Sequence, residues 1–210
     1  IGNMYYQGLG LTQDYAQAAQ WYRKAAALGS AEAMSVLGFL HEFGRGVPMD
    51  LAAALDWYRK AASGGNANAM TSLGRQYRAG SGIAQDYAQA MQWFKRAVDA
   101  GDREAMVQIG GLHSEGQGVT RDYAQAMQWF RRAADAGYPG GMNQVGRLHQ
   151  NGLGVKADFA EAMRWYRRAA DTGNFAGMYN VAWLYEKGGP GLSANRSEAM
   201  EVAEAEAKLV

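Results

Sequence analysis

The chain has 210 residues, a formal net charge of +1 and no cysteine. The absence of cysteine excludes disulfides, thiolate metal sites and cysteine nucleophiles, and the small charge gives no global field that would attract nucleic acid or an anionic membrane. No stretch approaches the roughly 18 apolar residues that a membrane span needs, so we expect no membrane insertion.

The sequence repeats itself every 36 residues. The string "DYAQAMQW" stands at Asp86–Trp93 and again at Asp122–Trp129, and two series of residues recur at this spacing: Trp21, Trp57, Trp93, Trp129 and Trp165; Met34, Met70, Met106, Met142 and Met178. A period of this length indicates one elongated array of stacked units rather than separate globular domains. We divide the array into a truncated first unit at 1–29, full units at 30–65, 66–101, 102–137 and 138–173, and a last unit at 174–210 with a diverged C-terminal helix.

The first residues match the middle of a unit. Ile1–Gly2 fall where Leu37–Gly38 and Leu73–Gly74 fall one and two periods later. We therefore interpret the chain as a fragment or processed product of a longer protein, with any targeting sequence upstream.

The unit 30–65 shows how each repeat is built. Ser30 is a suitable N-cap for a first helix that runs to Gly44, and Asp50 is a suitable N-cap for a second helix that Gly64–Gly65 end. Pro139 falls at the first helical position of its unit, where a missing N–H costs nothing. Each unit is thus predicted to be a helical hairpin with one apolar face, which only stacking against its neighbours can bury. In the last unit, Ala182 replaces the first-helix glycine, Val202 replaces the Trp and Glu204–Ala205 replace a basic pair. Such changes are expected of a terminal, capping repeat.

This pattern resembles the Sel1-like repeat, a relative of the tetratricopeptide repeat. The resemblance rests on residues 31–65, spelled "AEAMSVLGFLHEFGRGVPMDLAAALDWYRKAASGG", and its spacing covers essentially the whole chain. It implies an all-α, right-handed superhelical solenoid of antiparallel helix pairs whose first helices line a concave surface. It also implies protein or peptide binding, no cofactor, and a bacterial, exported or periplasmic protein by analogy.

Several candidate sites have a structural interpretation that we favour. His41, His113 and His149 share one repeat position with tyrosines, and tyrosine does not replace imidazole at zinc. The methionines recur as core fillers, the Trp-aromatic pairs as contacts between helices, and the "GRG"-like loops lack the rest of a phosphate-binding motif. The basic pairs from Arg23–Lys24 to Arg167–Arg168 are expected to be solvated, so we expect no nucleic-acid partner.

The residues that differ between units are the expected partner contacts. On the first helices these are Ser35, Phe39, Glu42, Thr71, Arg75, Arg78, Val107, Ser114, Asn143, Arg147, Gln150, Tyr179, Trp183 and Glu186. Aromatic and Arg residues often carry binding energy, and Arg holds carboxylates well. An acidic partner segment with a hydrophobic anchor is therefore predicted, while an equal alternative pairs these Arg residues with Glu42, Glu115 and Glu186.

The function predicted from the sequence is a non-enzymatic scaffold or adaptor. One alternative is a regulatory or targeting segment of a larger protein. A β-lactam-type hydrolase is a weaker alternative, because the related enzymes are cysteine-rich and this chain has neither cysteine nor a Ser-x-x-Lys motif. The sequence specifies neither the oligomeric state nor the identity of the partner.

Overall fold

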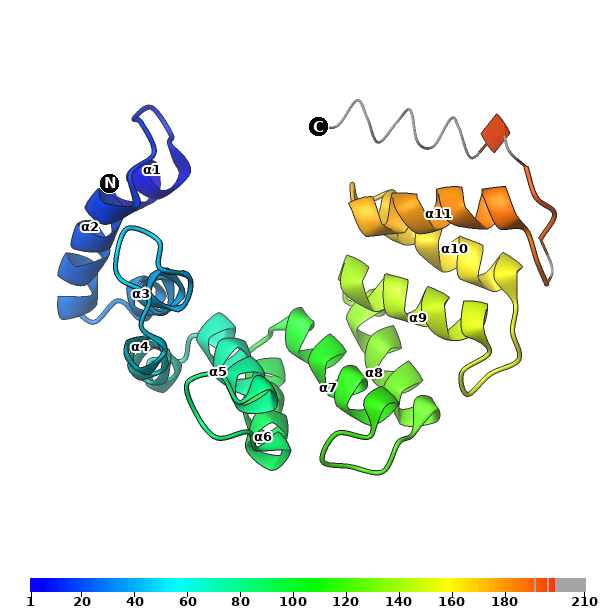
Figure 1. The fold of residues 1–210 in the computed structure, drawn as a ribbon, viewed down its shortest axis with the longest axis horizontal. Coiled ribbons are helices and arrows are strands. Elements are labelled where there is room, and N and C mark those ends of the chain that lie inside the picture. The colour runs from blue at the N-terminus through cyan, green and yellow to red at the C-terminus, as the bar shows by residue number, and fades with distance from the viewer. Residues whose placement is uncertain (191, 196, 199–210) are drawn as a thin grey trace. The chain divides into compact units, whose positions relative to one another are not determined.

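The computed structural model describes residues 1–190, 192–195 and 197–198. It divides into two compact parts, each larger than one repeat, which we call unit 1 (Ile1–Ala105) and unit 2 (Met106–Val210). Among the described residues, regular structure is helical apart from one isolated bridge between Gly189 and Leu192 (Figure 1). Val202 and Glu204–Ala205, on which the predicted divergence of the last helix depends, lie outside the described residues.

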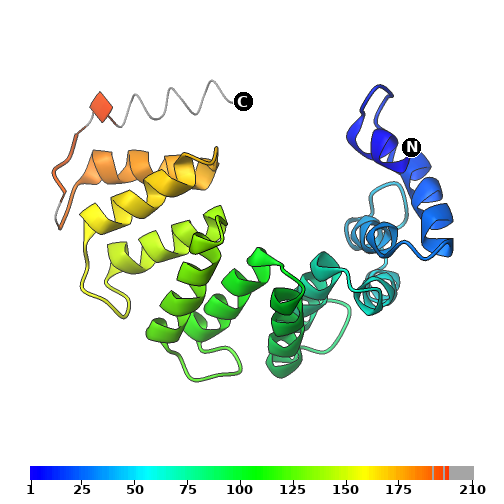
Figure 2. The same ribbon diagram turned by 180° about the vertical axis from the view of Figure 1, so that it is seen from behind.

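Each unit is made of helical hairpins, and the two views of the ribbon show the helices of each hairpin side by side (Figures 1 and 2). The first helices of the hairpins are α1 (Gly2–Gln7), α3 (Ala31–Phe43), α5 (Ala67–Ala79), α7 (Arg103–Glu115), α9 (Pro139–Asn151) and α11 (Phe175–Lys187). The second helices are α2 (Tyr15–Ala27), α4 (Leu51–Ser63), α6 (Tyr87–Asp99), α8 (Tyr123–Asp135) and α10 (Phe159–Ala170). Within each unit, a second helix contacts the first helices before and after it, as α4 contacts α3 and α5, and α10 contacts α9 and α11. This double contact buries the apolar face that one hairpin leaves open.

The predicted helix starts are confirmed by their capping hydrogen bonds. The Ser30 hydroxyl accepts from the Ala33 N–H at 3.2 Å, and the Asp50 carboxylate accepts from the Ala53 N–H at 2.9 Å. Helix α9 begins at Pro139, and its N-cap Tyr138 makes no side-chain capping bond. The Ser30 and Asp50 bonds satisfy N–H groups that have no partner within the helix, so these two residues determine where α3 and α4 begin.

The loop within each hairpin is a tight turn closed by backbone hydrogen bonds. In the repeat 30–65, the Asp50 N–H donates to the His41 carbonyl oxygen at 2.9 Å. Gly46 in this loop has φ 67°, and a Cβ there would lie 2.3 Å from the Tyr15 carbonyl carbon on α2. The glycine therefore allows the loop to lie directly against the preceding second helix, which explains the "GRG" sequence without a phosphate.

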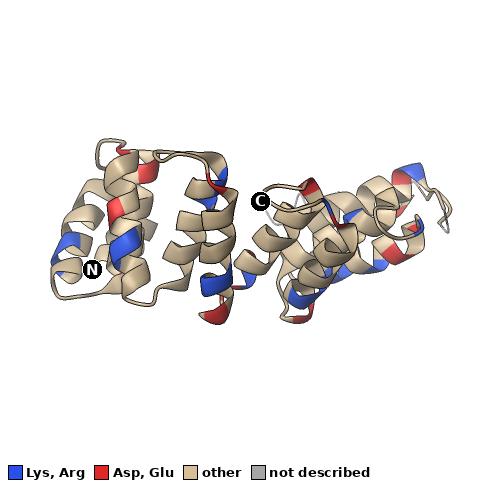
Figure 3. Ribbon diagram, turned by 90° about the horizontal axis from the view of Figure 1, so that it is seen from below, with Lys and Arg blue, Asp and Glu red and all other residues tan. Residues whose placement is uncertain are grey.

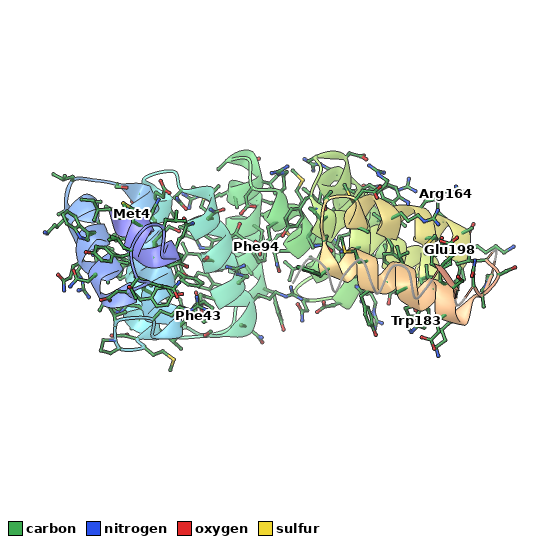
Figure 4. The ribbon with its side chains drawn as sticks, turned by 90° about the horizontal axis from the view of Figure 1, so that it is seen from above. Met4, Phe43, Phe94, Arg164, Trp183 and Glu198 are labelled. Carbon is green, nitrogen blue, oxygen red and sulfur yellow. The ribbon has the colours of Figure 1, made fainter. Side chains whose placement is uncertain are left out.

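The central contact within a hairpin joins a first-helix glycine to a second-helix aromatic ring. A Cβ on Gly74 would lie 2.4 Å from the Phe94 ring, and the same distance separates a Cβ on Gly110 from the Phe130 ring. Phe94 is fully buried, with no exposed surface, and Figure 4 shows its position on α6. Because Gly74 has no side chain, the Phe94 ring occupies the space beside it, and α5 and α6 approach each other closely.

The aromatic pair at this position divides into one buried and one half-buried ring. The Trp-aromatic pairs are predicted to be contacts between helices, but their two rings are not equally buried: Trp93 is half-buried, while Phe94 is buried. The reason is the 100° turn between adjacent helical residues, which points only one of the two rings at the glycine. The methionines agree with core filling, since Met70, Met127 and Met163 are buried.

The glycine contact predicts that one methyl group destabilises unit 1. Gly74→Ala should lower the free energy of unfolding by about 1–3 kcal/mol, because the added carbon overpacks the core. This loss should exceed the helix-propensity gain of about 0.5–1 kcal/mol. Phe94→Leu in the Gly74→Ala background should recover part of the loss, and urea denaturation of the single and double variants measures both effects. A Gly74→Ala variant as stable as the parent would contradict the close approach.

The burial difference predicts unequal costs for truncating the two adjacent rings. Phe94→Ala should lower the free energy of unfolding by about 3–5 kcal/mol, since it empties a buried site. Trp93→Ala should cost clearly less, because part of its surface already meets solvent. Thermal melts of both variants test the order, and a larger loss for Trp93→Ala would contradict the assignment.

Candidate partner-binding surface

The residues predicted to contact a partner differ widely in accessibility. Arg75, Arg147, Tyr179 and Glu186 are exposed; Ser35, Phe39, Glu42, Arg78, Val107, Asn143, Gln150 and Trp183 are half-buried; Thr71 and Ser114 are buried. On each unit, the exposed and half-buried members on the first helices make up what we call the first-helix surface of that unit, which in unit 1 includes the hollow described below.

Thr71 and Ser114 correct the predicted set. Thr71 is 1% exposed, and its hydroxyl donates to the Asp102 carboxylate at 2.5 Å. Ser114 is 7% exposed and donates to the Gly111 carbonyl oxygen at 3.0 Å. Both hydroxyls find partners within the protein, so burial costs little and neither side chain presents a surface to a partner.

Other predicted residues hold the hairpins together. The Tyr58 hydroxyl donates to the Glu42 carboxylate at 2.6 Å, and the Tyr166 hydroxyl donates to the Gln150 side-chain oxygen at 2.6 Å. Burial raises the pKa of Tyr58 above its ordinary value and raises the pKa of Tyr166 to about 12. Both hydroxyls therefore stay protonated donors at neutral pH, and Glu42 and Gln150 serve structure at least as much as recognition.

A hollow of about 350 Å³ lies on the first-helix surface of unit 1. It is lined by residues of α1, α3, α4, α5 and α7 and by Asp102, the residue before α7. Four predicted residues meet there, namely Ser35, Phe39, Thr71 and Arg75. Lining residues that the sequence reasoning missed include Tyr6, Tyr58, Asp102 and Glu104.

Arg75 in the hollow forms an ion pair within the chain, with a residue that the sequence analysis did not propose as its partner. Arg75 Nη1 lies 2.6 Å from Glu104 Oε1, and Arg75 Nη2 donates to the Ser72 hydroxyl at 3.1 Å. The proposed partners Glu42, Glu115 and Glu186 are not in this ion pair. Glu104 lies 29 residues further along the chain, at the start of the next first helix, so only the stacking of repeats brings the pair together.

In unit 2, the predicted residues form contacts of a different kind. Arg147 Nε donates to Gln144 Oε1 at 2.9 Å, and Asn143 donates to Asn174 Oδ1 at 2.9 Å. The Trp183 ring packs on Phe159 of α10 at 6.3 Å between centroids, whereas Tyr179 is 63% exposed (Figure 4 labels Trp183). Tyr179 is therefore a more accessible apolar anchor than Trp183.

The basic pairs lie on the second helices, where both members are exposed. Figure 3 marks Lys and Arg in blue along the ribbon. The second member of each pair stacks on the Trp three residues before it, with Arg96 4.2 Å from the centre of the Trp93 ring and Arg132 4.3 Å from that of Trp129. This cation–π contact explains why a basic residue follows the Trp by three positions in each of these repeats.

The three histidines occupy half-buried positions in their first helices. Their carbonyl oxygens, at His41, His113 and His149, each accept the hydrogen bond that closes the hairpin, as those of Tyr5 and Tyr77 do. Within residues 1–190, 192–195 and 197–198, no group of three or more His, Cys, Asp or Glu side chains is arranged to hold a metal ion. Burial lowers the pKa of His149, with smaller opposing effects from Glu161 and Asp158.

The fold and this surface define a helical-hairpin repeat protein. The Sel1 repeat model matches residues 1–30, 31–66, 67–102, 103–138, 139–174 and 176–201. The chain belongs to the Sel1 repeat family, and the predicted all-α repeat solenoid with its period of 36 residues is confirmed. No helix in the described part of the chain is both long and apolar enough to span a membrane.

Solved structures agree with this assignment. A Sel1 repeat protein from Oxalobacter formigenes is 32% identical with a TM-score of 0.87, and the match covers 100% of this chain and 85% of that one. The protective antigen c5321 of uropathogenic Escherichia coli is 32% identical with a TM-score of 0.66, over 99% of this chain and 52% of that one. Immunity protein Pa5087 from Pseudomonas aeruginosa shares the fold at 18% identity and a TM-score of 0.72, over 99% and 81%. No curated protein matches the chain.

The lowered pKa of His149 predicts a loss of stability in mild acid. Below about pH 6.5 the unfolded chain takes up a proton at this histidine that the folded chain resists, so stability should fall as the pH falls. His149→Tyr should weaken this dependence on pH and keep the fold, because tyrosine occupies the same position in other repeats. Melting temperatures across pH 5–8 measure the effect, with His113→Tyr as a control for the change of ring. An unchanged pH profile in His149→Tyr would refute the assignment.

Proposed function

We propose that the protein is a non-enzymatic scaffold that binds a segment of another protein across its first-helix surface. The observation that carries the proposal is the hollow of unit 1, which lies where the repeats differ from one another. Sel1 repeat proteins are in general protein-interaction scaffolds, and that family role supports the proposal.

The two sides of the hairpins support different roles. The second helices repeat the same stack of an exposed basic residue on a half-buried Trp, from Trp21–Lys24 to Trp165–Arg168. The first helices carry Phe39, Arg75, Arg147 and Tyr179 at positions that vary between units. A repeated surface suits structural support, whereas a varied surface suits recognition of one particular partner.

The chemistry of the partner follows from the side chains that remain accessible. An acidic segment with a hydrophobic anchor was predicted from the arginines, and in unit 2 the exposed Arg147 and Tyr179 support that pairing. In unit 1, Glu104 already holds Arg75, which weakens the case for an acidic partner there. A protein or peptide therefore remains the proposed partner class for both units, with different chemistry in each.

A capture experiment with charge reversal tests the proposal. The Arg147→Glu variant should lose a protein that the parent chain captures from a lysate of its source cells, because the change reverses an exposed charge on the first-helix surface of unit 2. The control variant Arg59→Glu/Arg131→Glu reverses two exposed charges on second helices and should keep it. Melting curves of both variants establish that they fold. Loss in the control and retention in the test variant would place binding on the other face.

A further inference from the structure

We propose that the hollow of unit 1 receives a basic side chain, Lys or Arg, from the bound segment. This inference rests on the proposed function and specifies its chemistry at one place. It replaces the acidic residue that the sequence suggested for Arg75 with a residue of the opposite charge.

The size and walls of the hollow suit a single long side chain. Its volume of about 350 Å³ lies at the lower end of ligand pockets. Tyr6 and Phe39 form one wall, with their ring centres 6.4 Å apart in an edge-to-face arrangement. The faces of such rings attract cations, and the methylene groups of Lys or Arg pack on apolar surface.

This group of rings already holds one cation. The Arg45 guanidinium lies 5.2 Å from the centre of the Phe39 ring and 5.6 Å from that of Tyr15. The contact shows that a positive group is compatible with the aromatic wall in its present arrangement. A second cation would enter from the side of the hollow that Tyr6 and Phe39 line.

The charges around the hollow favour a cation. Two carboxylates, Asp102 and Glu104, and one guanidinium, Arg75, line it. Among the lining residues the carboxylates outnumber the guanidinium, so a basic guest is attracted more than an acidic one.

An acidic guest meets two obstacles in the same place. It would compete with Glu104 for Arg75, whose ion pair measures 2.6 Å. The positive end of the α7 dipole would attract an anion, but Asp102 already caps it by accepting from the Glu104 N–H at 2.8 Å. The geometry therefore disfavours the carboxylate that Arg75 alone would suggest.

Three short peptides of matched shape test the inference directly. The probes are acetylated, amidated pentapeptides Ala-Leu-X-Leu-Ala in which X is lysine, norleucine or glutamate, titrated into the full chain and followed by NMR. The lysine peptide should bind tightest and shift the signals of Tyr6 and Phe39. Its advantage over norleucine should reach about fivefold, the upper range for one exposed ion pair. The advantage should shrink in high salt.

Two variants with opposite expected effects on the lysine preference distinguish a change in binding from a loss of folding. Glu104→Gln should remove most of the lysine preference, whereas Arg75→Gln should increase it, and Asp99→Asn on α6 is a matched control that should change nothing. Glutamate or norleucine binding as tightly as lysine would overturn the basic pocket while leaving the scaffold proposal in place. The absence of any shift at Tyr6 and Phe39 with all three peptides would also overturn it. The capture experiment with Arg147→Glu, which leaves the hollow of unit 1 unchanged, judges the scaffold proposal separately.

Discussion

The hairpins depend on one close approach, between a glycine on the first helix and an aromatic ring on the second. At Gly74 there is room for the Phe94 ring only because the glycine has no side chain. The ring is buried, while the neighbouring Trp93 turns partly to solvent. Because the same contact recurs at Gly38, Gly110 and Gly146, these repeats keep the same internal spacing while their outer residues change.

This contact separates two kinds of surface on every hairpin. Rings on the second helix that do not reach the glycine stack with the basic residue three positions later, as Trp93 does with Arg96 at 4.2 Å. The side of the first helix that faces away from the ring is free of that requirement, and there the units differ. A hollow at Phe39 and Arg75 can therefore form in one place without changing the packing of its neighbours.

Much of this arrangement is local, which is why the sequence predicts it well. Caps such as Asp50, the start of α9 at Pro139 and the glycine turns depend on residues within a few positions of each other. The chemistry of the hollow could not be read in the same way. Arg75 meets Glu104 only after the repeats stack, and the buried Thr71 hydroxyl finds its acceptor in Asp102, the residue before α7 in the next repeat. A repeat pattern shows which positions vary, whereas burial at those positions depends on contacts between repeats.

The most direct measurement of the central claim is hydroxyl-radical footprinting of the protein with and without a captured partner. The method reports the solvent accessibility of individual side chains, and the chain offers aromatic residues on both faces. If a partner lies on the first-helix surface, oxidation of Tyr6 and Phe39 should fall on binding, while oxidation of the half-exposed Trp57 and Trp93 should stay constant. Protection of Trp57 and Trp93 with unchanged Tyr6 and Phe39 would contradict the account and assign recognition to the second helices.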